Sequence, residues 1–180
     1  MTTDKPITLR RNCTAIMIPS GDIVSLSAGS SVWLTQSVGS SYTVMTDHGY
    51  SVRIDGQDGD ALGLAHIDNI RPAEGGGSVE DQVWQQLRFC FDPEIPVNIV
   101  ELGLVYACRV VALAGGGHKA VVHFTLTAQG CGMGQFIKED IRKKLLALPE
   151  IREVEVELVW EPPWNQSMIA VSAKQQLGIE

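Results

Sequence analysis

The chain has 180 residues, of which 44% are hydrophobic and 19% are charged, and its formal net charge is −7 at pH 7. This composition favours one domain or two small ones with a hydrophobic core, and it argues against intrinsic disorder. An acidic protein of this kind is a poor nucleic-acid binder, because phosphate neutralisation needs clustered Lys and Arg. The one dense basic stretch, Lys138 to Lys144, is predicted to lie on the exposed face of a helix.

The N-terminal residues 1–11 have no long apolar run after their charges, so they do not resemble a secretory signal. No apolar stretch approaches the ~20 residues that span a bilayer. We therefore expect a soluble, cytoplasmic protein without a membrane partner.

Residues 13–70 show apolar residues with a period near two, separated by turn residues such as Gly, Ser, Pro and Asp. The alternating positions are Ile16, Ile18, Val24, Leu26, Val32, Leu34, Tyr42, Val44, Tyr50, Val52 and Ile54. Short strands at this spacing are typical of a small antiparallel barrel or sandwich. The segment Arg71 to Ser78 (RPAEGGGS) has the composition of a linker. We predict a β domain over 1–72, a Gly-rich linker over 73–78 and a second domain over 79–180.

The second segment mixes helical and strand periodicity. Ser78 and Asp81 resemble a capping box that begins a helix, which should end before Asp92-Pro93. Further elements are predicted as a hairpin over 105–113 and 119–127, a helix over 134–148, a strand around 154–158 and a helix over 166–177. The order α-β-β-α-β-α predicts a three-stranded sheet covered by helices in two layers, and the whole chain is then of the α+β class.

Four cysteines occur, at 13, 90, 108 and 131, and their spacing fits neither a zinc ribbon nor a ferredoxin-type cluster motif. Cys131 lies between a predicted strand and a predicted helix, where the helix dipole stabilises a thiolate. The loop residues Thr127, Gly130 and Gly132 surround it, and glycines permit unusual backbone angles that leave a sulfur uncovered. A glycine-rich turn holding a small apolar cysteine is the alternative. The other three cysteines are expected to be packing residues.

Two proline-rich segments also carry polar or aromatic groups. Asp92 and Glu94 flank Pro93, so two acids stand on a stiff, extended backbone that can present them to a metal or partner, or can serve as a solvated connector. Glu161 and Trp164 flank two prolines, and Trp164 is expected either to anchor an interface or to cap the core.

Three motifs in order resemble one family. They are Asp92 to Tyr106 (DPEIPVNIVELGLVY), Thr125 to Cys131 (TLTAQGC) and Glu161 to Trp164 (EPPW), followed by Leu177-Gly178. Together they are similar to the SufT branch of the PaaD-like (MIP18-type) iron–sulfur assembly domain family, over about residues 78–178. Thr35-Gln36 and Ser41 to Val44 are similar to the N-terminal extension of SufT-type proteins.

The resemblance implies a non-enzymatic accessory factor in iron–sulfur cluster assembly or delivery. Its motif cysteine falls on Cys131 and its acidic pair on Asp92 and Glu94, while Ile169-Ala170 replaces the Met-Ser of relatives. It implies a transient cluster or iron, with no stably bound cofactor, and scaffold, carrier or client proteins as partners. A homodimer that shares a cluster is left open. The alternatives are an interaction adaptor without metal binding and a thiol enzyme that uses Cys131 as nucleophile.

Overall fold

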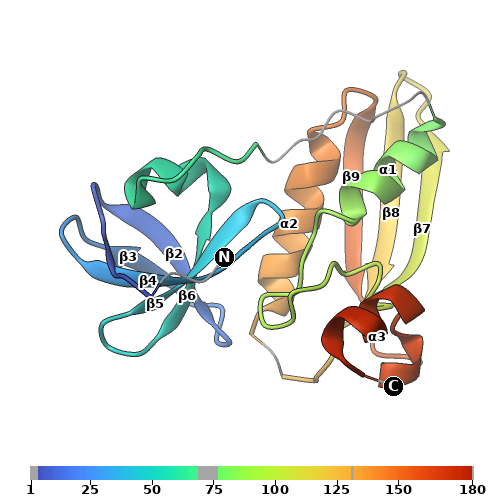
Figure 1. The fold of residues 1–180 in the computed structure, drawn as a ribbon. Helices are drawn as coiled ribbons and strands as arrows, with labels where there is room; N and C mark the ends of the chain where they lie inside the picture. The colour runs from blue at the N-terminus through green and yellow to red at the C-terminus, as the bar shows by residue number, and fades with distance from the viewer. Residues whose placement is uncertain (1–3, 69–76, 131, 180) are drawn as a thin grey trace. The chain divides into compact units, whose positions relative to one another are not determined.

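The computed structural model describes residues 4–68, 77–130 and 132–179, and the chain forms two compact units with one sheet in each. Figure 1 shows the first sheet in blue to green and the second, with its helices, in green to red. The α+β class predicted from the sequence is confirmed. Cys131 lies outside the described residues. Within the described residues, no helix is both long and apolar enough to cross a membrane.

The first unit is one antiparallel sheet. Its strands are β1 (Ile7–Thr8), β2 (Cys13–Ile18), β3 (Ile23–Leu26), β4 (Ser31–Val38), β5 (Ser41–Thr46) and β6 (Ser51–Asp55). They are hydrogen-bonded in the order β1-β4-β5-β6-β2-β3, so β1 and β3 are the two edges. The six strands form one sheet, so the sandwich predicted as one alternative is wrong, because a sandwich needs two sheets packed face to face.

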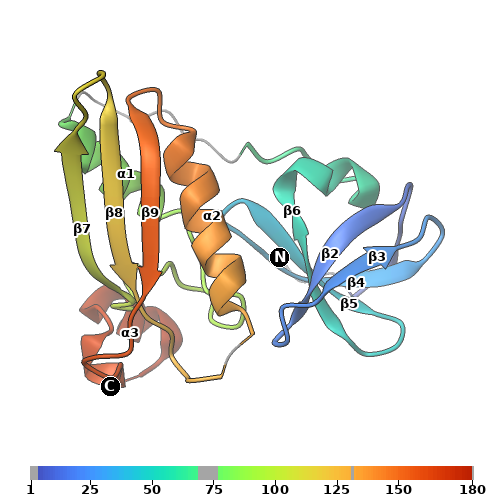
Figure 2. The same cartoon turned by 180° about the vertical axis from the view of Figure 1, so that it is seen from behind.

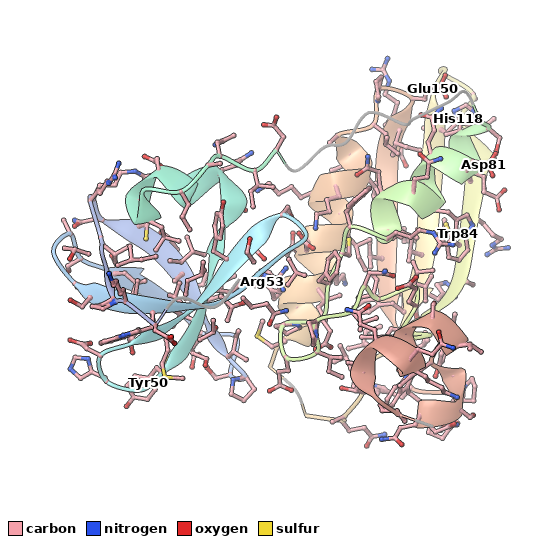
Figure 3. All side chains as sticks on the ribbon, in the orientation of Figure 1. Tyr50, Arg53, Asp81, Trp84, His118 and Glu150 are labelled. Atoms are coloured by element: carbon pink, nitrogen blue, oxygen red, sulfur yellow. The ribbon has the colours of Figure 1, made fainter. Side chains whose placement is uncertain are left out.

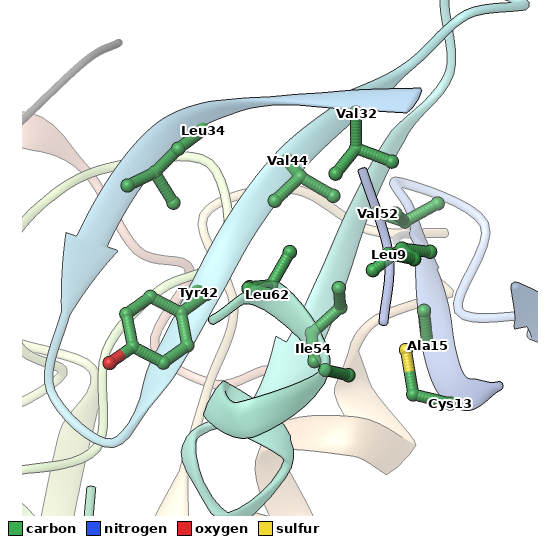
Figure 4. Close-up of a cluster of buried hydrophobic side chains, with 11 residues drawn as sticks. Leu9, Cys13, Ala15, Val32, Leu34, Tyr42, Val44, Val52, Ile54 and Leu62 are labelled. Carbon is green, nitrogen blue, oxygen red and sulfur yellow. The ribbon is translucent and has the colours of Figure 1, made fainter. Parts of the chain in front are cut away.

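The core of this unit lies on one face of the sheet (Figure 4). Alternate strand residues supply most of it: Leu9, Cys13, Ala15, Val32, Leu34, Tyr42, Val44, Val52, Ile54, Ala61 and Leu62. In β2 the buried residues are Cys13 and Ala15, not the predicted Ile16 and Ile18. Ala61 and Leu62 belong to the 3-10 helix η1 (Gly56–Leu62), where the sequence predicted only a turn. The Asp55 side chain accepts a hydrogen bond from the Gln57 amide at the start of η1, which caps it.

The second unit follows the predicted order. It comprises α1 (Val79–Leu87), β7 (Val105–Ala112), β8 (His118–Phe124), α2 (Gly134–Leu146), β9 (Ile151–Leu158), the 3-10 helix η2 (Gln166–Met168) and α3 (Val171–Leu177). Strands β7 and β8 form an antiparallel hairpin, and β9 runs parallel to β8 after the α2 crossover. Figure 1 shows α1 in front of the strands and Figure 2, the opposite view, shows it behind them, so α1 covers one face.

The covered face of this sheet is apolar and the other face is charged. Ala120, Val122 and Phe124 of β8 are fully buried, and α2 contributes Ile137 and Ile141 to the same core. On the open face Lys119 Nζ lies 2.6 Å from Glu155 Oε2. The predicted strand with one wet face is therefore present in β9.

Helix α1 begins at the capping box expected from the sequence. The Ser78 hydroxyl accepts a hydrogen bond from the Asp81 amide, and the Asp81 carboxylate accepts one from the Ser78 amide at 2.9 Å. The helix ends at Leu87, before Asp92-Pro93 as predicted.

Two helix predictions are wrong. The single helix expected over 166–177 is divided, because Ile169 and Ala170 are extended and the Ala170 amide donates to the Glu101 carbonyl at 2.8 Å. Lys144 is also not on an exposed face. Its side chain is buried in the second unit, where Nζ donates to Asp140 Oδ2 and to the Phe89 carbonyl, each at 2.7 Å.

Candidate functional site

The loop between β8 and α2 leaves the sheet at the carboxyl end of β8. The Thr125 amide donates to the Leu104 carbonyl at 2.8 Å, and the Val159 amide donates to the Phe124 carbonyl at 2.8 Å. These bonds fix the start of the loop beside the ends of two neighbouring strands. Ligand sites in sheets with parallel strands commonly lie at such carboxyl ends.

The described part of this loop changes from buried to exposed along the chain. Thr125 is 1% exposed, Thr127 is half-buried and Gly130 is exposed with φ of +82°. Gly132 is exposed as well, and Met133, which is fully buried, ends the loop as the N-cap of α2. The predicted exposed thiol of Cys131 lies outside the described residues and stays a prediction.

Two polar features of this loop carry unmet hydrogen-bonding capacity. The Thr125 Oγ1 atom is buried and has no hydrogen-bond partner among the described atoms. Met133 supplies no side-chain cap, so the first amides of α2 donate no hydrogen bond to an N-cap side chain. A helix N-terminus of this kind favours a negative group next to it.

The acidic segment forms a closed loop rather than the extended backbone predicted from the sequence. Phe91 and Asn98 form a β-bridge, and the Asp92 amide donates to the Val97 carbonyl at 3.2 Å. Asp92 is only 6% exposed, whereas Glu94 is exposed. The structure therefore places the two acids in different surroundings. Among the described residues, no three His, Cys, Asp or Glu side chains are grouped for a metal ion.

The segment after this loop is bound to the C-terminal motif. Gly103 has φ of +72°, and a Cβ there would lie 2.3 Å from the Met168 carbonyl oxygen, so only glycine fits. The backbones of Gly103 and Met168 therefore lie in close contact. Trp164 Nε1 donates to the Leu102 carbonyl at 2.8 Å, and Tyr106 Oη donates to the Pro162 carbonyl at 2.7 Å.

These bonds divide the EPPW motif into two parts. Trp164 is partly buried, and its indole N–H donates to a backbone carbonyl of the second unit, so the side chain has a structural role there. Glu161 and Pro162 instead line an open cleft of about 630 Å³ with Tyr106, His123, Val159 and Met168. Sequence reasoning did not find this cleft, because its residues come from four separate segments and share no spacing.

The other cysteines are packing residues, as expected. Cys13 is 5% exposed and Cys90 is 1% exposed, and Cys108 is half-buried on β7. Burial raises the pKa of the Cys108 thiol to about 11, with a smaller contribution from Glu80. Burial also raises the pKa of Cys13. Thiolate formation is unfavourable at both sites.

Comparison with known proteins places the second unit in a family. The family model described as "Iron-sulfur cluster assembly protein" matches residues 80–158. A relative from Porphyromonas gingivalis named "Fe-S protein maturation auxiliary factor" is 38% identical over 99 residues, which are 55% of this chain and 90% of that protein. "Fe-S protein maturation auxiliary factor SufT" of Staphylococcus aureus is 41% identical over 88 residues, which are 49% of this chain and 96% of that protein.

A solved structure agrees with this assignment. The crystal structure of a domain of unknown function from Bacillus anthracis is 39% identical, with a TM-score of 0.50, and covers 57% of this chain and 94% of that chain. About half of this chain aligns with each of these proteins, and the alignment spans nearly the full length of each one. The other half of this chain therefore has no counterpart in them. By its family model and these relatives, the chain belongs to the iron-sulfur cluster assembly protein family.

Proposed function

We propose that the protein is an accessory factor in iron–sulfur cluster assembly or delivery and acts without catalytic turnover. The observation that carries this proposal is the match to relatives named as maturation auxiliary factors over 90% or more of their length. The family model matches residues 80–158, which include the β8–α2 loop with Cys131.

Cys131 is the residue that we assign to a transient iron or cluster ligand. It stands two residues before the N-cap of α2, and no N-cap side chain competes for the helix amides. A thiolate near a helix N-terminus is stabilised by the dipole, and the thiolate is the form that binds iron. Of the two candidate supporting acids, Glu94 is the more accessible, because it is exposed while Asp92 is almost fully buried.

Anaerobic reconstitution with iron and sulfide, followed by absorption spectroscopy, tests this ligand assignment. Wild type and Cys108→Ser should take up the same amount of cluster or iron, because Cys108 is half-buried with a raised thiol pKa. Cys131→Ser should lose most of the uptake. Equal uptake by wild type and Cys131→Ser would remove Cys131 from the proposal.

A second role as an interaction adaptor is favoured by the cleft that Glu161 and Pro162 line. A partly apolar cleft suits a side chain of a scaffold, carrier or client protein. Complementation of a deletion strain separates the two roles, with activities of iron–sulfur enzymes measured under iron limitation. If Cys131→Ser restores those activities as wild type does, while Glu161→Lys does not, the adaptor role replaces the ligand role.

A further inference from the structure

The strand β3 is an unprotected edge of the first sheet. It is paired with β2 alone among the described strands, and its four residues, Ile23 to Leu26, carry no charge. Ile23 is 77% exposed. Proteins usually protect sheet edges with charges, prolines or bulges, or keep them very short, as the two-residue strand β1 does at the other edge. An apolar edge without these devices is suited to pairing with another strand.

The backbone groups available on this edge follow from the β2–β3 register. The Met17 amide donates to the Asp22 carbonyl at 2.8 Å, which makes these opposite residues a hydrogen-bonded pair. Hydrogen-bonded and non-hydrogen-bonded pairs alternate along antiparallel strands. The N–H and C=O groups of Ile23 and Ser25 therefore face away from β2, toward the open side of the edge.

A cavity of about 350 Å³ lies beside this edge, within the first unit. Its apolar lining is formed by Met17, Val24, Leu26, Val32 and Val52. Serine side chains from 25 to 31, together with Thr46 and Tyr50, add polar groups. Tyr50 is 56% exposed, and Figure 3 labels it at the end of the β5–β6 loop.

The edge and the cavity are linked by geometry. Val24 and Leu26 line the cavity, and residues opposite each other on paired strands point to the same face of a sheet. A strand added to β3 would therefore project every second side chain toward the cavity. This combination of backbone pairing and a side-chain pocket is how β-strand addition obtains affinity and specificity together.

The charged groups around this surface indicate the chemistry of the added strand. The cavity lining includes the Asp47 carboxylate and no Lys or Arg, and Asp22 directly precedes β3. His48 Nδ1 lies 2.6 Å from Asp47 Oδ1 at the same place. A segment with apolar residues at alternate positions and a basic residue at the end beside Asp22 is complementary to this surface.

We propose that β3 and its cavity bind such an extended segment of a partner protein, as a seventh strand of the first sheet. This site lies outside residues 80–158, which the family model matches, so it goes beyond the function proposed above. It gives the β unit a recruiting role that does not depend on Cys131.

Fluorescence anisotropy with a labelled synthetic peptide, KVTITVK, tests the proposal on the full chain. Wild type should bind it, and the peptide KVPIPVK, in which prolines remove backbone donors, should not bind. Ser25→Pro removes an edge N–H that β2 does not use and should weaken binding about tenfold, the equivalent of one or two lost hydrogen bonds. Ser25→Ala keeps that N–H and is the matched control, and Cys131→Ser should bind as wild type does.

Amide hydrogen exchange on the wild-type protein provides a readout that needs no variant to fold. Peptide binding should slow exchange at the Ile23 and Ser25 amides. Binding without protection of these amides, equal affinity for both peptides, or no binding at millimolar peptide would overturn the proposal. A dimer in sedimentation, with the same amides protected before peptide is added, would assign the edge to a second copy of this chain instead.

Discussion

At the scale of single residues, the cysteines should separate by reactivity. Cys13 and Cys90 are buried and the pKa of the Cys108 thiol is about 11, so little thiolate forms at these sites near neutral pH. We expect iodoacetamide to label Cys131 first in the native protein, and mass spectrometry of peptides would identify the site. Labelling at Cys108 should continue to rise with pH up to about 11, because the raised pKa delays its thiolate.

The control for this experiment is the denatured protein, in which all four cysteines should react at similar rates. If Cys131 in the native protein reacts as slowly as Cys90, the assignment of an exposed and activated thiol is wrong. Cys13 and Cys90, which are buried, provide the reference rate for a thiol inside a core.

Lys144 is the second residue whose surroundings lead to a prediction. Lys144→Ala would leave the Asp140 carboxylate, whose side chain is 13% exposed, without its cation, and the Phe89 carbonyl would lose a hydrogen bond. Removing one partner of a buried pair typically costs about 3–5 kcal/mol of unfolding free energy. Urea denaturation should show a loss of this order, while Lys138→Ala on the same helix should change stability by less than about 1 kcal/mol.

The burial of Lys144 could be predicted from the sequence only in part. The basic stretch predicts a solvated helix face, because isolated lysines rarely lie in a core. Its acceptors are Asp140, one turn earlier, and a backbone carbonyl 55 residues away. The first is visible as an i, i+4 pair in the sequence, but the second depends on how α1 packs against α2.

At the scale of elements, the helix starts differ in their caps. Ser78 caps α1 with φ −60° and ψ 162°, and Ala170 at the N-cap of α3 has nearly the same backbone, φ −59° and ψ 148°, but no side-chain hydrogen bond. Ala170→Ser should therefore supply the missing cap and raise the free energy of unfolding by about 0.5–2 kcal/mol. Ser78→Ala should lower it by a similar amount. Thermal unfolding of both variants checks the pair, and an unchanged or lower melting temperature for Ala170→Ser would contradict the first expectation.

The elements were mostly predictable, and the failures have a common cause. The strands between Ile16 and Ile54 and the capping box at Ser78 depend on local patterns and were predicted correctly. The buried face of β2 was not, because Cys13 and Ala15 lie in the core rather than Ile16 and Ile18. The break at Ile169 and Ala170 depends on the Ala170 amide reaching the Glu101 carbonyl, a contact between distant segments. The cleft beside Glu161 also depends on contacts between distant segments, since Tyr106 and Met168 come together there only after folding.

At the scale of the whole molecule, the family domain should fold without the β unit. The two relatives described above are covered over 90% and 96% of their length by aligned segments of 99 and 88 residues, so a domain of that size is sufficient in them. We expect a fragment of residues 78–180 to unfold cooperatively and to reconstitute with iron as the full chain does. Circular dichroism during heating and the reconstitution assay measure these two properties.

The same fragment separates the roles proposed for the two units. It lacks β3 and its cavity, so it should no longer bind the KVTITVK peptide, while it keeps the loop from Thr125 to Met133. If the fragment folds but fails to take up iron, the second unit alone is not sufficient for iron uptake. If it folds and still binds the peptide, the recruiting site lies in the second unit, and the cleft beside Glu161 becomes the surface to test.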